Sequence, residues 1–175
     1  RRLFEGDRVR IGGRDWRVIV GYGHSPEHAS LYCAELAVLI SGDMLLPRIS
    51  TNVSVMSSNP DGDPIRLFLD SISRYEALPE DTLVLPSHGR PFRGIHARAA
   101  QLAAHHEERF EALLAVLDTP KSACELIPTL FKRELDAHQI MFAMGESIAH
   151  LNYLEHAGRA KRTQDADGVF RFVTV

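Results

Sequence analysis

Short runs of apolar residues, separated by glycine-containing turns, make up the first half of the chain. Residues 8–11 and 15–20 flank a Gly-Gly pair and show the alternation of a β-hairpin. Residues 30–34 and 36–41 predict two more strands, and the second is nearly all apolar, as expected if both of its faces are buried. The first half is therefore expected to form a sheet, mixed or antiparallel.

A helix is expected after a polar loop that contains glycine and proline. Asp63 suits an N-cap, Pro64 suits the first turn, and the apolar positions that follow, up to Tyr75, recur at helical spacing. Residues 82–85 then predict a short apolar strand. A rigid turn follows it, with prolines at both ends and His88 near its apex.

The composition becomes helical in the second half of the chain. Residues 97–117 are rich in Ala, Leu, Glu and Gln, a shorter helix is expected at 122–131, and a longer helix at 137–156 ends before Gly158. Two alternating runs around an Asp-Gly turn predict a terminal β-hairpin, at 159–164 and 169–175. Helix, helix, long helix and hairpin is the order of a winged-helix module.

Composition and charge narrow the class of protein. The chain has 175 residues, of which 45% are hydrophobic, so it can bury a core and is not of the disordered class. A formal net charge of −3 gives no general attraction to nucleic acid or to an anionic membrane. No apolar run has the length of a membrane span. The two cysteines, Cys33 and Cys124, are expected to be buried and reduced, as is typical of a cytoplasmic protein.

Three polar residues share one placement in this pattern. His24, Asp43 and His88 each follow an apolar strand, in a loop that contains glycine. Such loops often hold catalytic groups, and imidazole with carboxylate is a ligand set for zinc, iron or manganese. Taken alone, each histidine is explained more simply as an ordinary turn residue.

His24 and His28 are not expected to form a helical pair. The segment from Gly21 to His28 is GYGHSPEH, and its glycines and proline disfavour a helix. The spacing of four residues therefore does not place both rings on one face, and each ring is considered by itself.

Longer segments around these residues resemble a known family. In order and spacing, GHSPEH, LISGDMLLPRISTNVSV and LVLPSHGRPF closely resemble the later motifs of the metallo-β-lactamase superfamily of metal-dependent hydrolases. The tail, from LLAVLDTPKSACELIPTLF to MGESIAHLNYLEHAGRAKR, resembles the winged-helix extension of a glyoxalase II-like branch. The resemblance implies an α/β protein: the C-terminal half of an αββα sandwich at residues 1–97, followed by a winged-helix-like α+β domain at 98–175.

The resemblance also implies roles for individual residues. His24 corresponds to a ligand of a first metal, His88 to a ligand of a second, and Asp43 to the catalytic carboxylate that bridges the two. Two such cations, zinc with iron or manganese as alternatives, activate a hydroxide for attack on a carbonyl carbon or a phosphorus. His28 corresponds to a position outside the ligand set, where it either orients the loop or is a hydrogen-bonded turn histidine.

The chain departs from the superfamily in one motif. His-x-His-x-Asp-His, which supplies the other ligands, is absent. His105 and His106 do not replace it, because neighbouring helix positions do not share a face, and their surroundings are expected to be a solvated charged face. We therefore expect the C-terminal part of a longer hydrolase whose partner is its missing N-terminal half. Alone, it is expected to bind metal weakly or not at all, and to oligomerise.

Residues around the expected site and wing have competing explanations. Ser50, Thr51 and Asn52 follow Asp43 and either contact the substrate or form a polar surface loop. The basic residues of the wing either contact phosphate or have no such role, and they are Arg159, Lys161 and Arg162.

The long helix before the wing is expected to bury a stripe of apolar residues. They are Met141, Phe142, Met144, Ile148 and Leu151. A role of the tail as a lid or interface is therefore favoured over nucleic-acid binding.

The leading functional prediction is a metal-dependent hydrolase that acts on a small acyl thioester or a related ester, because enzymes of the resembling branch are glyoxalase-like. One alternative is a phosphodiesterase or endoribonuclease, since two metals also suit phosphoryl transfer. Another is a non-catalytic winged-helix fragment that binds nucleic acid or a partner. The negative net charge counts against nucleic acid in both alternatives.

Overall fold

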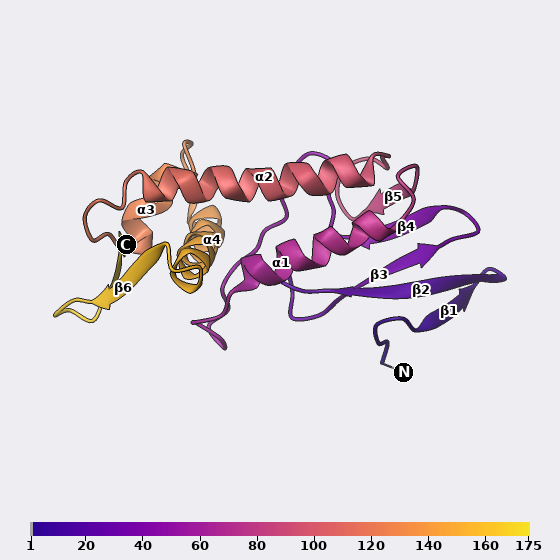
Figure 1. Cartoon of the computed structure of the whole chain (residues 1–175), viewed down its shortest axis with the longest axis horizontal. Helices are drawn as coiled ribbons and strands as arrows, with labels where there is room; N and C mark the ends of the chain where they lie inside the picture. The colour runs from indigo at the N-terminus through magenta and orange to yellow at the C-terminus, as the bar shows by residue number, and fades with distance from the viewer. Residues whose placement is uncertain (1) are drawn as a thin grey trace. The chain divides into compact units, whose positions relative to one another are not determined.

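The structure is a computed structural model that describes residues 2–175 (Figure 1). The chain divides into two compact units. The first unit comprises the residues up to Thr51 together with Leu67–Ala103, and the second comprises Asn52–Arg66 together with Ala104–Val175. The domain boundary expected after residue 97 remains a prediction. No helix of the described residues is both long and apolar enough to cross a membrane.

The first unit is built on a mixed five-stranded sheet in the order β1-β2-β3-β4-β5 (Figure 1). Its strands are β1 (Arg8–Ile11), β2 (Arg14–Gly21), β3 (His28–Cys33), β4 (Val38–Gly42) and β5 (Leu83–Pro86). Neighbours are antiparallel except for β4 and β5, which are parallel. The expectation was a sheet that is mixed or antiparallel, and the structure has a mixed one.

Three helical segments accompany the strands: α1 (Pro64–Ser73), the 3-10 turn η1 (Arg74–Ala77) and α2 (Ile95–Leu114). Asp63 caps α1, because its carboxylate accepts a hydrogen bond of 3.0 Å from the backbone N–H of Arg66. The cap predicted from the Asp-Pro pair is thus confirmed.

The two faces of the sheet differ in burial. Tyr32, Leu39 and Val84 pair in one row across β3, β4 and β5, and they are 8%, 0% and 0% exposed. Ser30 lies on the same face, 2.8 Å from the hydroxyl of Tyr75 in η1. The neighbouring row points to the other face; in it Leu31 and Leu85 are half-buried and Ile40 is 38% exposed. Across β3, β4 and β5 the first of these faces is therefore buried, whereas the second is only partly covered.

The second unit contains the last turns of α2, then α3 (Ala123–Leu130), α4 (Ala137–His156), β6 (Ala160–Gln164) and β7 (Phe170–Thr174). Capping boxes begin both later helices, at Ser122 and Asp136. Gly158 has a φ of +70° just after α4, as predicted for a C′ glycine. An antiparallel bridge from Lys121 to Phe172 adds a short edge to the β6–β7 hairpin.

Several expectations about burial in the second unit were wrong. His106 is 1% exposed and therefore does not belong to a solvated charged face. Met141 and Phe142 are 64% and 45% exposed, so the stripe on α4 is buried only in part. Cys124 is exposed, whereas Cys33 is buried as expected.

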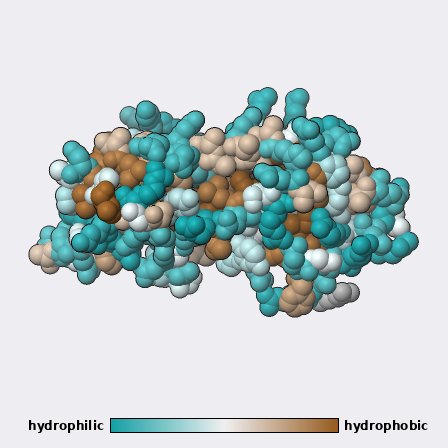
Figure 2. Space-filling view, in the orientation of Figure 1, coloured by the Kyte–Doolittle hydropathy of each residue, from teal (hydrophilic) through white to brown (hydrophobic). Residues whose placement is uncertain are grey.

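Figure 2 shows brown apolar areas between the teal hydrophilic ones on the face drawn.

Candidate active site

The three predicted ligands follow strands that run in the same direction. Because β2 and β4 are both antiparallel to β3, and β5 is parallel to β4, the carboxyl ends of β2, β4 and β5 lie at one edge of the sheet. His24, Asp43 and His88 follow these three ends directly. Strand direction thus brings together residues that are far apart in the sequence.

The carboxylate of Asp43 lies between the two imidazoles. Its Oδ2 is 3.6 Å from Nε2 of His24, and its Oδ1 is 3.5 Å from Nε2 of His88. His24 and Asp43 are about one-third exposed, while His88 is 68% exposed. Ser87, next to His88, also donates a hydrogen bond of 2.5 Å to Oδ1. Each carboxylate oxygen therefore faces a different histidine.

His28 packs against the backbone that carries Asp43. Its Nε2 accepts a hydrogen bond of 3.3 Å from the backbone N–H of Asp43, so the proton of the neutral ring is on Nδ1. Burial lowers the pKa of His28, the neighbouring His24 lowers it further, and Asp43 opposes the shift. These contacts fit the expected role of orienting the loop.

Gly42 makes this approach of His28 possible. Its φ is +55°, and a Cβ at this position would lie 2.4 Å from Nε2 of His28. A side chain at residue 42 would therefore be strained by its backbone and would displace the ring.

The expected substrate contacts lie in different settings. Thr51 is 2% exposed, and its hydroxyl donates a hydrogen bond of 2.6 Å to the carbonyl oxygen of Asp43. Asn52 belongs to the second unit, where its amide donates to Glu146 at 3.5 Å and its carbonyl accepts from Ser54 at 2.8 Å. Ser50 is half-buried. The burial of Thr51 favours support of the loop over contact with substrate.

The donor set fits half of a two-metal centre. Imidazole nitrogen and carboxylate oxygen suit Zn²⁺, Fe²⁺ and Mn²⁺. Each oxygen of Asp43 faces one histidine, which gives two pairs of ligand atoms, each made of one imidazole nitrogen and one carboxylate oxygen. Within residues 2–175, no three His, Cys, Asp or Glu side chains are arranged to hold one metal ion. A closed metal site is therefore not formed by the described residues alone.

Two family descriptions match the chain. Residues 1–88 match the metallo-beta-lactamase superfamily, and residues 110–175 match the metallo-beta-lactamase-like C-terminal domain. The chain belongs to the metallo-beta-lactamase superfamily. The superfamily implies metal ions.

Solved structures of the superfamily share this fold. A beta-lactamase domain protein from Burkholderia ambifaria is 54% identical, with a TM-score of 0.97 over 100% of this chain and 52% of its own. A metallo-beta-lactamase family protein from Thermus thermophilus is 35% identical, with a TM-score of 0.87 over 99% of this chain and 54% of its own. The chain thus spans about half the length of these relatives.

Two relatives of known sequence are named as hydrolases. A probable metallo-hydrolase of Bacillus subtilis is 28% identical over 82% of this chain and 46% of its own length. The hydroxyacylglutathione hydrolase of Cereibacter sphaeroides is 34% identical over 49% of this chain and 31% of its own length. Relatives in the metallo-beta-lactamase superfamily therefore include glyoxalase II-like enzymes.

The arginines of the C-terminal hairpin form ion pairs within the second unit. Arg159 pairs with Glu107 and Glu111 at 3.0 and 2.6 Å. Arg162 pairs with Asp61 and Glu155 at 2.7 and 3.2 Å. These two cations are therefore already neutralised by carboxylates, which weakens the case that they contact phosphate.

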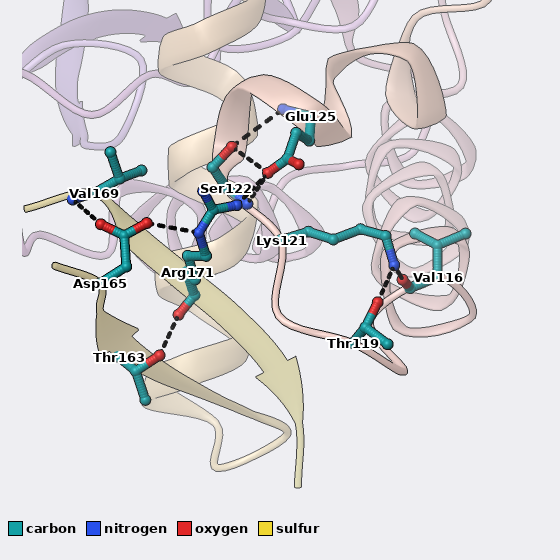
Figure 3. Close-up of polar contacts among 9 residues, drawn as sticks. All are labelled: Val116, Thr119, Lys121, Ser122, Glu125, Thr163, Asp165, Val169 and Arg171. Carbon is teal, nitrogen blue, oxygen red and sulfur yellow. Dashed lines mark hydrogen bonds and ion pairs between the residues drawn. The ribbon is translucent and has the colours of Figure 1, made fainter. Parts of the chain in front are cut away.

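Arg171 is held in the same way and links the hairpin to the start of α3 (Figure 3). Its guanidinium lies 2.8 Å from Asp165 and 2.7 Å from Glu125, and Glu125 also accepts from the backbone N–H of Ser122 at 2.8 Å. The hairpin is thereby tied to the capping box of α3.

Proposed function

We propose that this chain contributes one half of a two-metal centre that hydrolyses an acyl thioester or a related ester. The observation that carries the proposal is the position of Asp43, whose two carboxylate oxygens each face a different imidazole. In this position Asp43 would be shared by two cations, with His24 as a ligand on one side and His88 on the other.

The described residues have different roles in the proposed centre. His24 with Oδ2 of Asp43 would hold one cation, and His88 with Oδ1 would hold the other, with further ligands from elsewhere in the protein. Bound divalent cations supply a Lewis acid for the carbonyl oxygen and lower the pKa of water to near neutrality. His28, Thr51 and Ser87 fix the backbone and carboxylate of Asp43 through hydrogen bonds.

Thioester chemistry is supported by the relatives and by the charge distribution. Hydroxyacylglutathione hydrolases match this chain at 28% to 35% identity, each over part of their length. Cleavage of RNA requires attraction to a polyanion, which derives largely from free basic groups. The net charge is −3, and two of the three basic residues of the wing, Arg159 and Arg162, are paired with carboxylates. Acyl transfer to water is therefore favoured over phosphodiester cleavage.

Turnover by the zinc-loaded, full-length protein tests this proposal. Acyl thioesters, acyl esters and phosphodiesters are offered in parallel, with bound metal measured by elemental analysis. We expect thioester hydrolysis, and a loss of at least about 100-fold with less bound metal in Asp43→Ala, because the bridge supports both cations. Asp81→Ala is the matched control, since Asp81 is an exposed carboxylate elsewhere in the first unit. Turnover of phosphodiesters alone contradicts the substrate class, and near-normal turnover by Asp43→Ala contradicts the site.

A further inference from the structure

A pocket of about 630 Å³ opens beside His88 in the first unit. Two loops form it, one after β4 and one after β5. The lining residues are Pro47, Arg48, Ile49, His88, Gly89, Arg90, Pro91 and Phe92. His88 thus belongs both to the candidate metal site and to the wall of this pocket.

Hydrogen bonds hold the loop after β4 in place. The guanidinium of Arg98, from α2, donates to the carbonyl oxygen of Leu46 at 2.6 Å and to that of Ile49 at 2.9 Å. These two carbonyls flank Arg48, so the backbone on both sides of this residue is fixed while its side chain is exposed.

The loop after β5 is fixed by backbone contacts. Phe92 and Val84 exchange hydrogen bonds of 2.8 and 3.1 Å across an antiparallel bridge. Gly89, with a φ of +88°, packs so closely on Pro47 that a Cβ would lie 2.6 Å from its ring. The two loops therefore meet directly, and the pocket has walls set by backbone contacts.

Two cations of this pocket have no carboxylate partner among residues 2–175. Arg48 and Arg90 are exposed, and neither forms an ion pair or a hydrogen bond with another residue of the described part of the chain. Many other arginines are paired, for example Arg2 with Glu27 and Arg14 with Glu35. An unpaired guanidinium presents a planar set of donors that matches a carboxylate or a phosphate.

Apolar side chains line the same pocket. Ile49 and Phe92 line the pocket together with Pro47 and Pro91. A ligand that fits this lining carries an anionic group and an uncharged segment. The pocket also lies next to His88, where the reacting carbonyl would be bound.

We propose that Arg48 and Arg90 bind a carboxylate or phosphate group of the substrate, so that the enzyme selects anionic acyl thioesters over neutral ones. This inference rests on the proposed hydrolase function, because it places the anion beside the same metal centre. Ile49 and Phe92 cover the uncharged segment that joins the anion to the reacting group.

Binding of inert thioethers tests the pocket separately from catalysis. The probes are S-hexyl ethers of N-acetylcysteamine, which is neutral, of 3-mercaptopropionate and of 2-mercaptoethyl phosphate, titrated into the protein by calorimetry. We expect at least one anionic probe to bind about 5- to 10-fold more tightly than the neutral one, as for a charge-assisted hydrogen bond in a wet site. The tighter of the two anions identifies the group, and rising salt reduces the preference.

Substitutions identify the residues responsible. Arg48→Gln and Arg90→Gln should each remove most of the preference for the anion, whereas Arg48→Lys retains part of it because the charge remains. Arg8→Gln, an exposed arginine on β1, controls for net charge. All variants are compared by thermal unfolding, and little change is expected since both side chains are exposed. Equal binding of all three probes, or an anion preference that survives both substitutions, overturns the inference.

The hydrolase proposal has a separate readout. If the anion preference depends on Arg48 and Arg90 but the zinc-loaded protein turns over no thioester, the anion site is supported and the proposed hydrolase reaction is wrong. If thioesters are hydrolysed with equal kcat/KM whatever their charge, the reaction stands and the anion site is wrong.

Discussion

Asp43 is held at its main chain as well as at its carboxylate. Its N–H donates to His28, its carbonyl accepts from Thr51, and Oδ1 accepts from Ser87. A bridging group has to stay within a few tenths of an ångström of its position to serve two cations at once. We therefore expect these surrounding hydrogen bonds to matter for the site in addition to the candidate ligands.

Gly42→Ala should disturb this arrangement more than a comparable glycine substitution. The left-handed backbone alone costs about 1–2 kcal/mol for a residue with a Cβ. At Gly42 the new methyl also overlaps His28, and such overpacking adds about 1–3 kcal/mol. Gly12→Ala is the control, because its φ is +57° and nothing lies within 4 Å of a Cβ there. Urea denaturation measures both variants, and equal losses would show that His28 gives way freely.

Thr51→Val separates support of the loop from contact with substrate. The change keeps the shape of the side chain and removes the hydroxyl that donates to Asp43. We expect a loss of about 1 kcal/mol in unfolding free energy, because the part-buried carbonyl of Asp43 loses its donor, together with a lower kcat. Ser50→Ala should raise KM if Ser50 contacts substrate. A Thr51→Val variant with normal kcat and raised KM would assign Thr51 to substrate binding instead.

The candidate ligands were predictable at the residue scale, whereas their surroundings were not. His24, Asp43 and His88 stand in motifs at strand ends, which the sequence shows directly. Arg48 and Arg90 lie in the same motifs. The sequence does not show that these two arginines lack carboxylate partners, because pairing depends on contacts across the fold. The bond from Ser87 to Asp43 depends in the same way on the pairing of β4 with β5.

At the scale of elements, α2 and α4 meet through a buried pair of histidines. Nδ1 of His150 lies 2.8 Å from the carbonyl oxygen of Glu146 and must donate to it, which leaves Nε2 as an acceptor. His106 donates from Nδ1 to this Nε2 at 3.1 Å. Burial lowers the pKa of His106 to about 3 and that of His150 to about 4. Both rings are therefore neutral in the folded protein.

This pair predicts a loss of stability in mild acid. The unfolded chain binds a proton at each histidine below pH 6.5, whereas the folded chain does not until about pH 4 or 3. Stability is therefore fully present above pH 6.5 and falls by about 1.4 kcal/mol per pH unit for each histidine below it. Between pH 7.5 and 5.5 we expect the pair to cost about 2–3 kcal/mol.

Urea denaturation across this range measures the effect. His106→Gln should reduce the loss by about half, and His138→Gln, on the exposed start of α4, should leave it unchanged. Burial raises the pKa of Glu146, so the protonation of this carboxyl opposes the loss as the pH falls. Stability that is flat between pH 7.5 and 5.5 would contradict a neutral buried pair.

Periodicity predicted the elements well but not which residues they bury. The predicted helix at 137–156 matches α4, because caps and a glycine mark its ends. His106 was assigned to solvent on account of its charged neighbours, although Phe110 and Leu113 continue its position along one face of α2 and both are buried. Met141 was assigned to the core because it lies among apolar residues, although it is 64% exposed. Burial depends on what packs against a helix, which its own sequence does not contain.

At the scale of the whole molecule, the sheet of the first unit has an apolar face that is only partly covered. Ile40 is 38% exposed between the half-buried Leu31 and Leu85, while the opposite row is buried. Relatives about twice as long as this chain share its fold closely. We propose that a second sheet, carrying the remaining metal ligands, packs on this face.

The partly covered face predicts that the chain self-associates when it is studied alone. Apolar area stabilises association by about 25 cal/mol per Å², so a row of aliphatic side chains in water favours contact between copies. Ile40→Glu places a charge in the middle of that row and should shift the population towards monomer in light scattering. Leu36→Glu is the matched control, because Leu36 is 44% exposed in the turn between β3 and β4 and does not belong to this face. A wild-type chain that stays monomeric at every concentration, or equal effects of the two substitutions, would show that this face is not a packing surface.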